Sequence, residues 1–383
     1  MSYNHGVRSK KSQDGIRAIK DVQTSLIVLL GTAEDADSNK YPLDTPILVS
    51  AASNEAHGKL GAKGTLQKAF DGIRDQIGAN VVVIRIDYSG SEADLKSRMV
   101  QKVQLLRGVE SVVGEKPKVI IAPGFTTIET AQANPVVAEM LTITEGLRAI
   151  VLADGTNTNN ADAIQARGHY GSKRLMIVDP NVKVWDTVQN KYIDDFATPR
   201  IAGLFAKNDA ERSAFHCPSN MIVKGIGGTS RAIQYATSDV NSEHNLLNKK
   251  QIGTIVNSNG YRFLGTDTCD ITDSDNRFIN AVRGGDALDD ALEAGIQWAL
   301  DRNITKTFVE DVKATVQGFI DNKIAQGDLL PGSKVIADPE LNSPTAYAQG
   351  QVYFNYDYAI PTPAVDIVIT RKVNYDFSKG IFN

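Results

Sequence analysis

The chain has 383 residues, a hydrophobic content of 42%, a charged content of 22% and a formal net charge of −4. This length exceeds one ordinary core, so two or three domains are expected, and the slightly acidic balance argues against a nucleic-acid-binding protein. No run approaches the roughly 18 apolar residues that span a bilayer, and neither end carries an apolar leader. We therefore expect synthesis in a cytoplasm, with no membrane insertion by this chain.

The N-terminal part of the chain predicts an arm followed by a small domain. Residues 1–22 are mostly polar and show no sizeable apolar face, so they are assigned to an N-terminal arm. Residues 23–105 combine strand patterns with helical spacing from Thr65 to Ile77, and are assigned to a small β-α-β domain. Its strands are predicted at the continuous apolar run 26–30 and at two similar, mostly apolar runs, residues 46–50 and 81–86.

Residues 106–270 repeat this alternation on a larger scale. Apolar strands lie about thirty residues apart with helical patterns between them, which indicates a parallel sheet built from right-handed crossovers. Because the strands are apolar on both faces, helices should cover both sides of the sheet. The segment is therefore predicted to be a central doubly wound α/β domain, with strands at 119–122, 148–153 and 174–178 and helices at 135–145 and 160–170.

The pattern changes again in residues 271–363, which predict a C-terminal α+β domain. Two amphipathic helices are expected, one through the apolar stripe 288–300 and one over 307–324. Two strands follow, at 334–337 and at the aromatic segment 351–358.

The last segment of the chain does not read as the end of a self-contained domain. Pro361 and Pro363 interrupt the strand pattern, since proline cannot donate a backbone hydrogen bond. Residues 365–373 then alternate as a new strand with no later segment to pair with it. Such a strand folds back or lends its edge to another chain. We assign 364–383 to a C-terminal arm and expect an assembly protein.

A serine hydrolase is the main catalytic alternative. Gly228–Ala232 is similar to the nucleophile motif of subtilases, and Asp154 and His169 precede Ser230 in the order of that family. However, only fifteen positions separate Asp154 from His169, and the sequence around His169 lacks the longer helix signature of the family. A loop that uses Thr229 and Ser230 as turn residues is favoured.

Metal and phosphate sites are not predicted. The five histidines are scattered, the acidic run 270–275 lacks the glycine and closing glutamate of a calcium loop, and Gly225–Gly228 is not followed by the Lys-Ser/Thr of a phosphate loop. We therefore predict no catalytic residue, no metal and no cofactor.

Several short runs occur together in one order and resemble the contractile tail sheath proteins of phage tails and R-type bacteriocins. The resemblance covers essentially the whole chain and implies a subtilisin-like central domain without protease function. The matching runs are His5–Val7 with Gly15–Ile19, Ile121–Gly124, Gly171–Leu175 with Val178–Pro180 and Val184–Asp186, Cys217–Asn220 with Gly225 and Gly228–Arg231, Asn259–Gly265 with Thr268, and Trp298–Thr305.

This resemblance implies a structural, non-enzymatic subunit. Such subunits polymerise as a helical stack of six-fold rings around an inner tail tube protein, and the sleeve contracts to drive the tube through a target envelope. The implied partners are copies of the chain itself, the tube, and baseplate and tail terminator proteins, with no direct contact to nucleic acid. The implied location is a virion tail or a bacteriocin particle. A static tube or shell protein that never contracts remains an alternative.

The resemblance also assigns roles to individual residues. The N- and C-terminal arms of neighbouring subunits add strands to the C-terminal sheet of a third, and an inward-facing part of that domain grips the tube. A solvated helix face is the alternative for the tube-facing cations. The implied arm-strand residues are Val7, Ile16, Ile19, Ile367, Ile369 and Val373, the hinges are Gly15, Pro361 and Pro363, and the candidate tube-facing residues are Arg277, Arg283, Arg302, Lys306 and Lys313.

Overall fold

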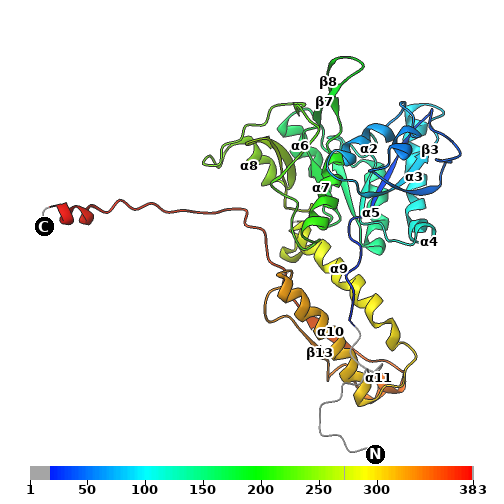
Figure 1. The fold of residues 1–383 in the computed structure, drawn as a ribbon, viewed down its shortest axis with the longest axis vertical. Coiled ribbons are helices and arrows are strands. Elements are labelled where there is room, and N and C mark those ends of the chain that lie inside the picture. Colours follow the sequence, from blue (N-terminus) through cyan, green and yellow to red (C-terminus); the bar gives the residue numbers. More distant parts are fainter. Residues whose placement is uncertain (1–17, 271, 382–383) are drawn as a thin grey trace, which may run out of the picture.

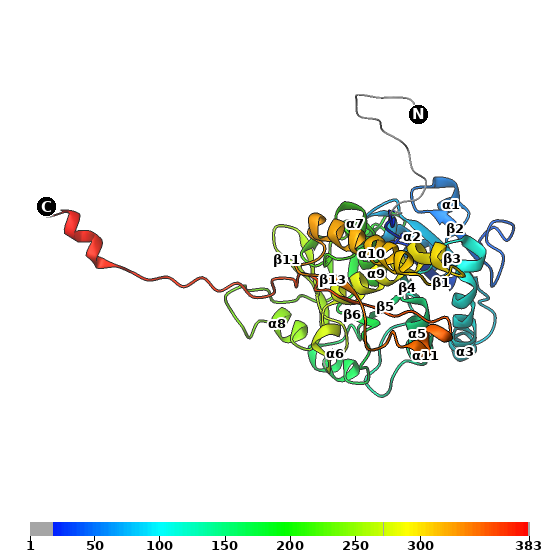
Figure 2. The same cartoon turned by 90° about the horizontal axis from the view of Figure 1, so that it is seen from below.

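The computed structural model describes residues 18–270 and 272–381. Figure 1 shows a broad α/β body, a helical module attached to one end of it, and a C-terminal segment that leaves the molecule and runs away from both. Figure 2 shows the same separation from below, with the C-terminal segment still clear of the body. The described chain thus consists of two packed parts and one projecting arm.

The body is built around a nine-stranded sheet with the order β2-β3-β1-β4-β5-β6-β11-β12-β9. Neighbouring strands from β3 through β1, β4, β5 and β6 to β11 are parallel, while β2 at one edge and β12 and β9 at the other are antiparallel. The strands are β1 Ile27–Thr32, β2 Pro46–Ser50, β3 Asn80–Ile86, β4 Val119–Ile121, β5 Ile150–Asp154, β6 Leu175–Val178, β9 Met221–Ile222, β11 Ile252–Asn257 and β12 Tyr261–Leu264.

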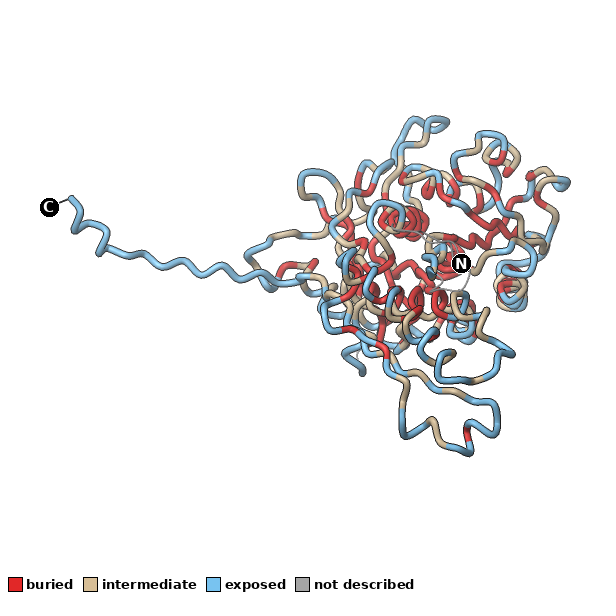
Figure 3. The backbone as a smooth tube through the Cα atoms, turned by 60° about the horizontal axis from the view of Figure 1, so that its bottom comes forward, coloured by how far each residue is buried: buried red, intermediate tan, exposed pale blue. Residues whose placement is uncertain are grey.

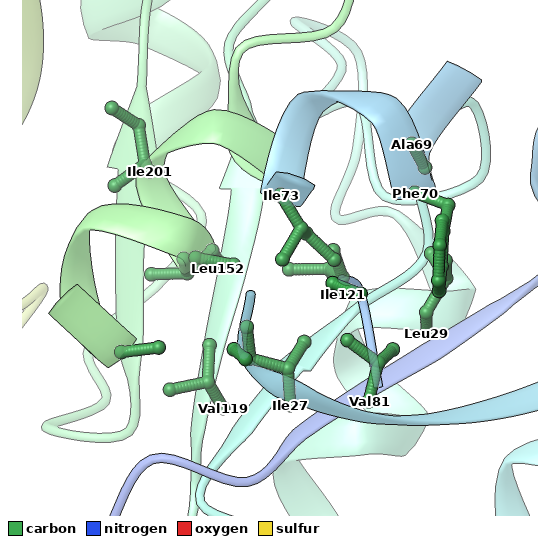
Figure 4. Packing of buried hydrophobic residues seen from close by; sticks show 14 of the residues in the cluster. Ile27, Leu29, Ala69, Phe70, Ile73, Val81, Val119, Ile121, Leu152 and Ile201 are labelled. Atoms are coloured by element: carbon green, nitrogen blue, oxygen red, sulfur yellow. The ribbon is translucent and has the colours of Figure 1, made fainter. Parts of the chain in front are cut away.

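Helices cover both faces of this sheet because its central strands are apolar on both faces. In β1, Ile27 and Leu29 point to the cluster that includes Phe70 of α2 and Ile201 of α7 (Figure 4). Val28, between them, points to the opposite cluster with residues of α3, α5 and α6. These helices are α2 Leu66–Arg74, α3 Glu92–Lys102, α5 Pro135–Leu147, α6 Asn160–Arg167 and α7 Thr198–Glu211.

Shorter elements complete the body. A three-stranded sheet, β10-β7-β8, carries a hairpin that projects from the end of the body opposite the helical module (Figure 1). Its strands are β7 Val182–Asp186, β8 Lys191–Asp195 and β10 Gly228–Thr229. The remaining helical segments are α1 Asn54–Gly58, η1 Val103–Gly108, α4 Val109–Val113, α8 Glu243–Asn248 and η2 Ser274–Asn276.

The helical module has a hydrophobic core of its own, separate from the two sheet clusters. Its members include Leu288 and Leu292 of α9, Phe319 and Ile320 of α10, and Val335 of the two-stranded sheet β13-β14. The elements are α9 Ile279–Ile296, η3 Gln297–Ala299, α10 Lys306–Gln326, β13 Lys334–Ala337, α11 Pro344–Ala348, β14 Phe354–Asp357 and, in the arm, η4 Tyr375–Ile381.

The predicted mixed α/β fold with parallel strands is confirmed, whereas the specific likeness to a subtilisin stays a prediction. Two features differ from expectation. The boundary drawn at residue 105 falls inside one sheet, because β1 pairs with both β3 and β4. The predicted strand at 365–373 has no pairing partner in the described residues, so it forms an extended arm without belonging to a sheet.

Candidate assembly surfaces

The two-stranded sheet of the helical module has one blocked edge and one open edge. Val335 lies opposite Tyr356 in the antiparallel register. Its N–H points away from β14, because it donates to Oε1 of Gln317 on α10 at 2.9 Å. In an antiparallel pair this leaves the backbone groups of Phe354 and Tyr356 directed to the outer edge of β14. Within residues 18–270 and 272–381 no other strand pairs there.

One face of this sheet is fixed against the helices. Val335 is buried, and Phe354 and Tyr356 pack against the same core. The hydroxyl of Tyr356 donates to the carboxylate of Asp289 on α9, and its ring stacks on that of Tyr358 with centroids 5.5 Å apart. Burial, followed by the neighbouring Asp289 carboxylate, raises the pKa of Tyr356. The open edge of β14 is therefore held in place by side chains below it.

The C-terminal arm leaves the module at the two prolines. Nδ2 of the buried Asn280 donates to the carbonyl oxygen of Pro361 at 3.1 Å, and Ile360 packs against Gly284 of α9. Every residue from Ala364 to Ile381 is exposed, as the unbroken pale-blue tube in Figure 3 shows. Ile369, in the middle of the arm, is 88% exposed. The arm-strand residues Ile367, Ile369 and Val373 thus have no covering surface in the described chain.

The described part of the N-terminal arm lies against its own module. Ile19 and Val22 are partly buried on the core of α9 and α10, and Asp21 pairs with Nζ of Lys323 at 2.7 Å. A Cβ atom at Gly295 would lie 2.5 Å from Cγ1 of Ile19, so the segment touches α9 closely. The predicted arm residues Val7 and Ile16 and the predicted hinge Gly15 lie outside the described residues.

An ion-pair seam joins the module to the sheet body. Three cations, Lys118, Arg148 and Arg174, stand just before the parallel strands β4, β5 and β6, and an acidic stripe on α9 lies across them. Several ion pairs make up this seam. Lys116 and Arg148 lie 2.9 and 2.8 Å from Asp290, and Arg148 also lies 2.5 Å from Glu293. Lys118 pairs with Asp290, and Arg174 pairs with Asp286.

Asp290 is the centre of this seam. Burial on its own would raise the pKa of this carboxyl group, but hydrogen bonds from Lys118 and Lys116 outweigh burial and lower the pKa to about 2. Burial lowers the pKa of Lys118 itself. The spacing of Asp286, Asp290 and Glu293 on one helical face was a readable signal in the sequence, but its cationic partners lie more than a hundred positions away.

The five candidate tube-facing cations occupy different environments. Arg283 is only 5% exposed. It binds Asp209 through Nη1 at 3.0 Å and through Nη2 at 2.5 Å, so its side chain is not accessible for the predicted tube contact. Arg277 is exposed but pairs with Asp267 at 3.0 Å, and the guanidinium of exposed Arg302 lies over the ring of Trp298. Lys306 and Lys313 are exposed on α10. Four of the five therefore remain accessible.

The three residues of the hydrolase alternative do not form a triad. Asp154 is buried and accepts hydrogen bonds from the N–H groups of Ala197 and Thr198, at the start of α7. Nε2 of His169 contacts the carbonyl oxygen of Thr130 at 3.0 Å. Oγ of Ser230 donates to the carbonyl oxygen of Asn181 at 3.1 Å and also contacts Asn157. Each group has its own structural partners, so nucleophile and base are not in contact.

Asp154 nevertheless has a displaced pKa. Burial raises its pKa to about 6, against the opposing effect of the Thr198 hydrogen bonds.

In the described ranges no group of three histidine, cysteine or acidic side chains is placed to hold a metal ion. No helix there is both long and apolar enough to cross a bilayer.

Comparisons with known proteins agree on one family. Residues 99–269 match the central domain of phage tail sheath proteins. A prophage major tail sheath protein of Pseudomonas aeruginosa is 33% identical, over 95% of both chains. The tail sheath protein of Escherichia phage P2 is 27% identical, over 97% of this chain and 96% of its own.

Solved structures show the same fold. The helical sheath of the anti-feeding prophage in its contracted state superposes with a TM-score of 0.72 at 17% identity, covering 98% of this chain and 100% of that one. The contracted sheath of the PVC extracellular contractile injection system gives a TM-score of 0.70 at 15% identity, over 98% and 99% of the two chains. The chain belongs to the family of contractile tail sheath proteins.

Proposed function

We propose that this chain polymerises as a helical stack of six-fold rings around an inner tail tube, and that contraction of the sleeve drives the tube through a target envelope. The observation that carries this proposal is the exposed arm at 364–381 together with the open edge of β14 in the same molecule. An unpaired strand and an unpaired edge complete each other when they come from different copies. Its location would be the tail of a virion or of a bacteriocin-like particle.

Strand exchange would use the open edge of β14. Residues 365–373 alternate, so Val365, Ile367 and Ile369 share one face while Asp366 and Val368 share the other. If the arm of a neighbouring copy pairs with β14, its apolar face continues the buried face formed by Val335 and Tyr356. The other edge of the sheet is less suitable, because Gln317 already occupies the N–H of Val335.

The hinge of the arm would lie at Pro361 and Pro363. The chain is fixed up to Pro361 by Asn280, and it is exposed from Ala364 to Ile381. A rotation of the arm relative to α9 therefore requires backbone changes only in the short segment 361–364. Hydrogen-bonded strand contacts would then persist while the packed parts of each subunit move as rigid bodies.

Contact with the tube would use accessible cations of the helical module. Arg277, Arg302, Lys306 and Lys313 remain the candidates after Arg283 is removed from the set. The baseplate and the tail terminator would contact the two ends of the sleeve. Contraction would consume no nucleotide, because lateral contacts formed between subunits would supply the free energy, and the chain would act without an enzymatic step.

The experiment is negative-stain electron microscopy of the purified full-length chain beside a variant that lacks residues 365–383. We expect hollow striated tubes from the full chain and none from the truncated one. A more specific comparison uses two full-length variants. The double variant Ile367→Lys with Ile369→Lys places charges on the apolar face of the arm and should not form tubes. Val368→Lys, on the other face, is the control and should form them. Tubes from the truncated chain would contradict strand exchange, and particles whose sleeve never shortens would indicate a static tube.

A further inference from the structure

The C-terminal arm carries a second apolar feature beyond its strand. Residues Tyr375–Ile381 form the short helix η4, in which Tyr375 is 83% and Phe377 82% exposed, and Ile381 is exposed as well. Local contacts shape the turn: Oδ1 of Asn374 accepts from the N–H of Asp376 at 2.9 Å, and Oγ of Ser378 donates to the carbonyl oxygen of Tyr375 at 2.7 Å.

These side chains need a partner surface. A seven-residue helix has little stability of its own in water, and large apolar side chains gathered on so short a segment mark an interaction site. In the described residues the three side chains meet no other part of the chain, since the arm is exposed from Ala364 to Ile381 (Figure 3). The strand pattern ends at Val373, so the turn follows directly where a paired strand would stop.

A matching surface lies on the connection between β13 and β14, residues 338–353, which we call the platform. It exposes three large apolar side chains, Leu341, Tyr347 and Tyr353. Hydrogen bonds tie the two ends of the platform together: the amide of Asn342 exchanges two hydrogen bonds, both 2.8 Å, with the backbone of Tyr353. Oδ1 of Asp338 also accepts from the N–H groups of Glu340 and Leu341, at 2.8 and 3.1 Å.

An antiparallel direction of the exchanged strand would bring the turn and the platform together. β14 begins at Phe354, directly after the platform, and runs away from it. A strand that adds antiparallel to the open edge of β14 therefore runs towards the platform and ends beside it. Only Asn374 separates Val373 from the turn, so Tyr375 and Phe377 would arrive at this end of the sheet. The exposed Glu340 there is opposite in charge to Lys379 of the turn, which within its own chain pairs with Asp376 at 3.0 Å.

We propose that the turn Tyr375–Ile381 is a second anchor of the arm and docks on the platform of a second copy of this chain. The proposal rests on the strand exchange proposed above and adds the direction of the exchanged strand. Tyr375, Phe377 and Ile381 pack against Leu341, Tyr347 and Tyr353 of the neighbouring copy. The anchor blocks the exchanged strand from sliding along β14, whose short edge offers few backbone groups to fix the register.

The test is disulfide cross-linking between copies. Phe377→Cys chains are mixed with Tyr347→Cys chains, assembled into tubes and oxidised, and cross-linked dimers are counted on a non-reducing gel. Because each chain carries one of the two cysteines, the mixed product forms only between copies. Burial raises the pKa of both native thiols, Cys217 and Cys269, to about 12, so the engineered thiols react first. The matched control replaces Tyr347→Cys by Val188→Cys, which is exposed on the distant β7–β8 hairpin.

We expect dimers from the Phe377→Cys and Tyr347→Cys mixture and not from the control mixture. The full-length variant Tyr375→Ser with Phe377→Ser should still form tubes, at a critical concentration about tenfold higher than that of the unchanged chain. Tubes without the specific cross-link would overturn the anchor and leave the sleeve intact, as would an unchanged critical concentration. Failure of the unchanged chain to form tubes would instead count against the proposed function.

Discussion

Lys118 and Asp290 form an ion pair in which the two side chains are only 6% and 5% exposed. The residues are 172 positions apart in the sequence, one immediately before β4 and the other in the middle of α9. Their contact joins the sheet body to the helical module at the edge where the parallel strands begin. Asp290 also pairs with Lys116 and Arg148, so its carboxylate forms ion pairs with three cations.

Asp290→Asn should destabilise the fold strongly. The substitution keeps the shape of the side chain but removes the charge that pairs with the buried Lys118, and an uncompensated buried charge costs about 3–5 kcal/mol. Urea unfolding of the dilute, unassembled chain measures the effect as a lower midpoint. Glu310→Gln is the matched control, since Glu310 makes an exposed pair with Lys306 on α10 and should change stability by less than about 0.5 kcal/mol. Equal shifts in the two variants would show that the seam is not stabilising.

The contribution of Asp290 should disappear in acid. Its pKa is lowered from 3.8 to about 2 in the folded chain, so the ionised form favours folding above pH about 4 and this advantage is lost as the pH falls towards 2. The displacement corresponds to about 2 kcal/mol. The difference in unfolding midpoint between the original chain and Asp290→Asn, measured from pH 6 to pH 2, should shrink over that window. Asp154, with its raised pKa, is present in both proteins and cancels in the difference.

Two glycines of the helical module should respond to alanine in opposite directions. A Cβ atom at Gly318 of α10 would meet nothing within 4 Å, so Gly318→Ala should stabilise the module by about 0.5–1 kcal/mol through helix propensity. At Gly295 the added atom would lie 2.5 Å from Ile19, so Gly295→Ala should detach the segment at Ile19 from α9. Faster proteolysis near residue 19 in Gly295→Ala than in Gly318→Ala is the expected readout, and equal cleavage would contradict the close contact.

Ser230→Ala should affect stability but not chemistry. The substitution removes hydrogen bonds to Asn181 and Asn157 and should cost about 0.5–1.5 kcal/mol, while tubes still form. A fluorophosphonate probe, which labels activated serines, should label neither the original chain nor the variant. Labelling that depends on Ser230 would restore the hydrolase alternative.

The sequence predicted the local elements well, because strands such as β1 and β5 are continuous apolar runs and α10 has a clear amphipathic period. It also predicted where the packed chain ends, since Pro361 and Pro363 break the pattern and nothing later can pair with residues 365–373. These features depend on neighbours in the sequence, and the structure shows an exposed arm at that place.

Features that depend on distant partners were missed. The environment of Arg283 is decided by Asp209, which lies on α7, a helix that the sequence patterns did not reveal. Segments 23–105 and 106–270 share one sheet because β1 pairs with β4. No local sequence pattern encodes this pairing. The local sequence alone does not distinguish a buried arginine such as Arg283 from an exposed one such as Arg277.

Helix α9 belongs to both packed parts of the subunit at once. Asp286 and Asp290 on one side are tied to the strand beginnings, and Leu288 and Leu292 on another side form the core with α10. An eighteen-residue helix of about 27 Å acts as a stiff strut between the two. The same helix reaches β14, because Asp289 of α9 accepts a hydrogen bond from the hydroxyl of Tyr356, so a movement of the body would carry the edge of β14 with it. In a filament made from this chain, bending and stretching would therefore take place in the C-terminal arms that connect the subunits.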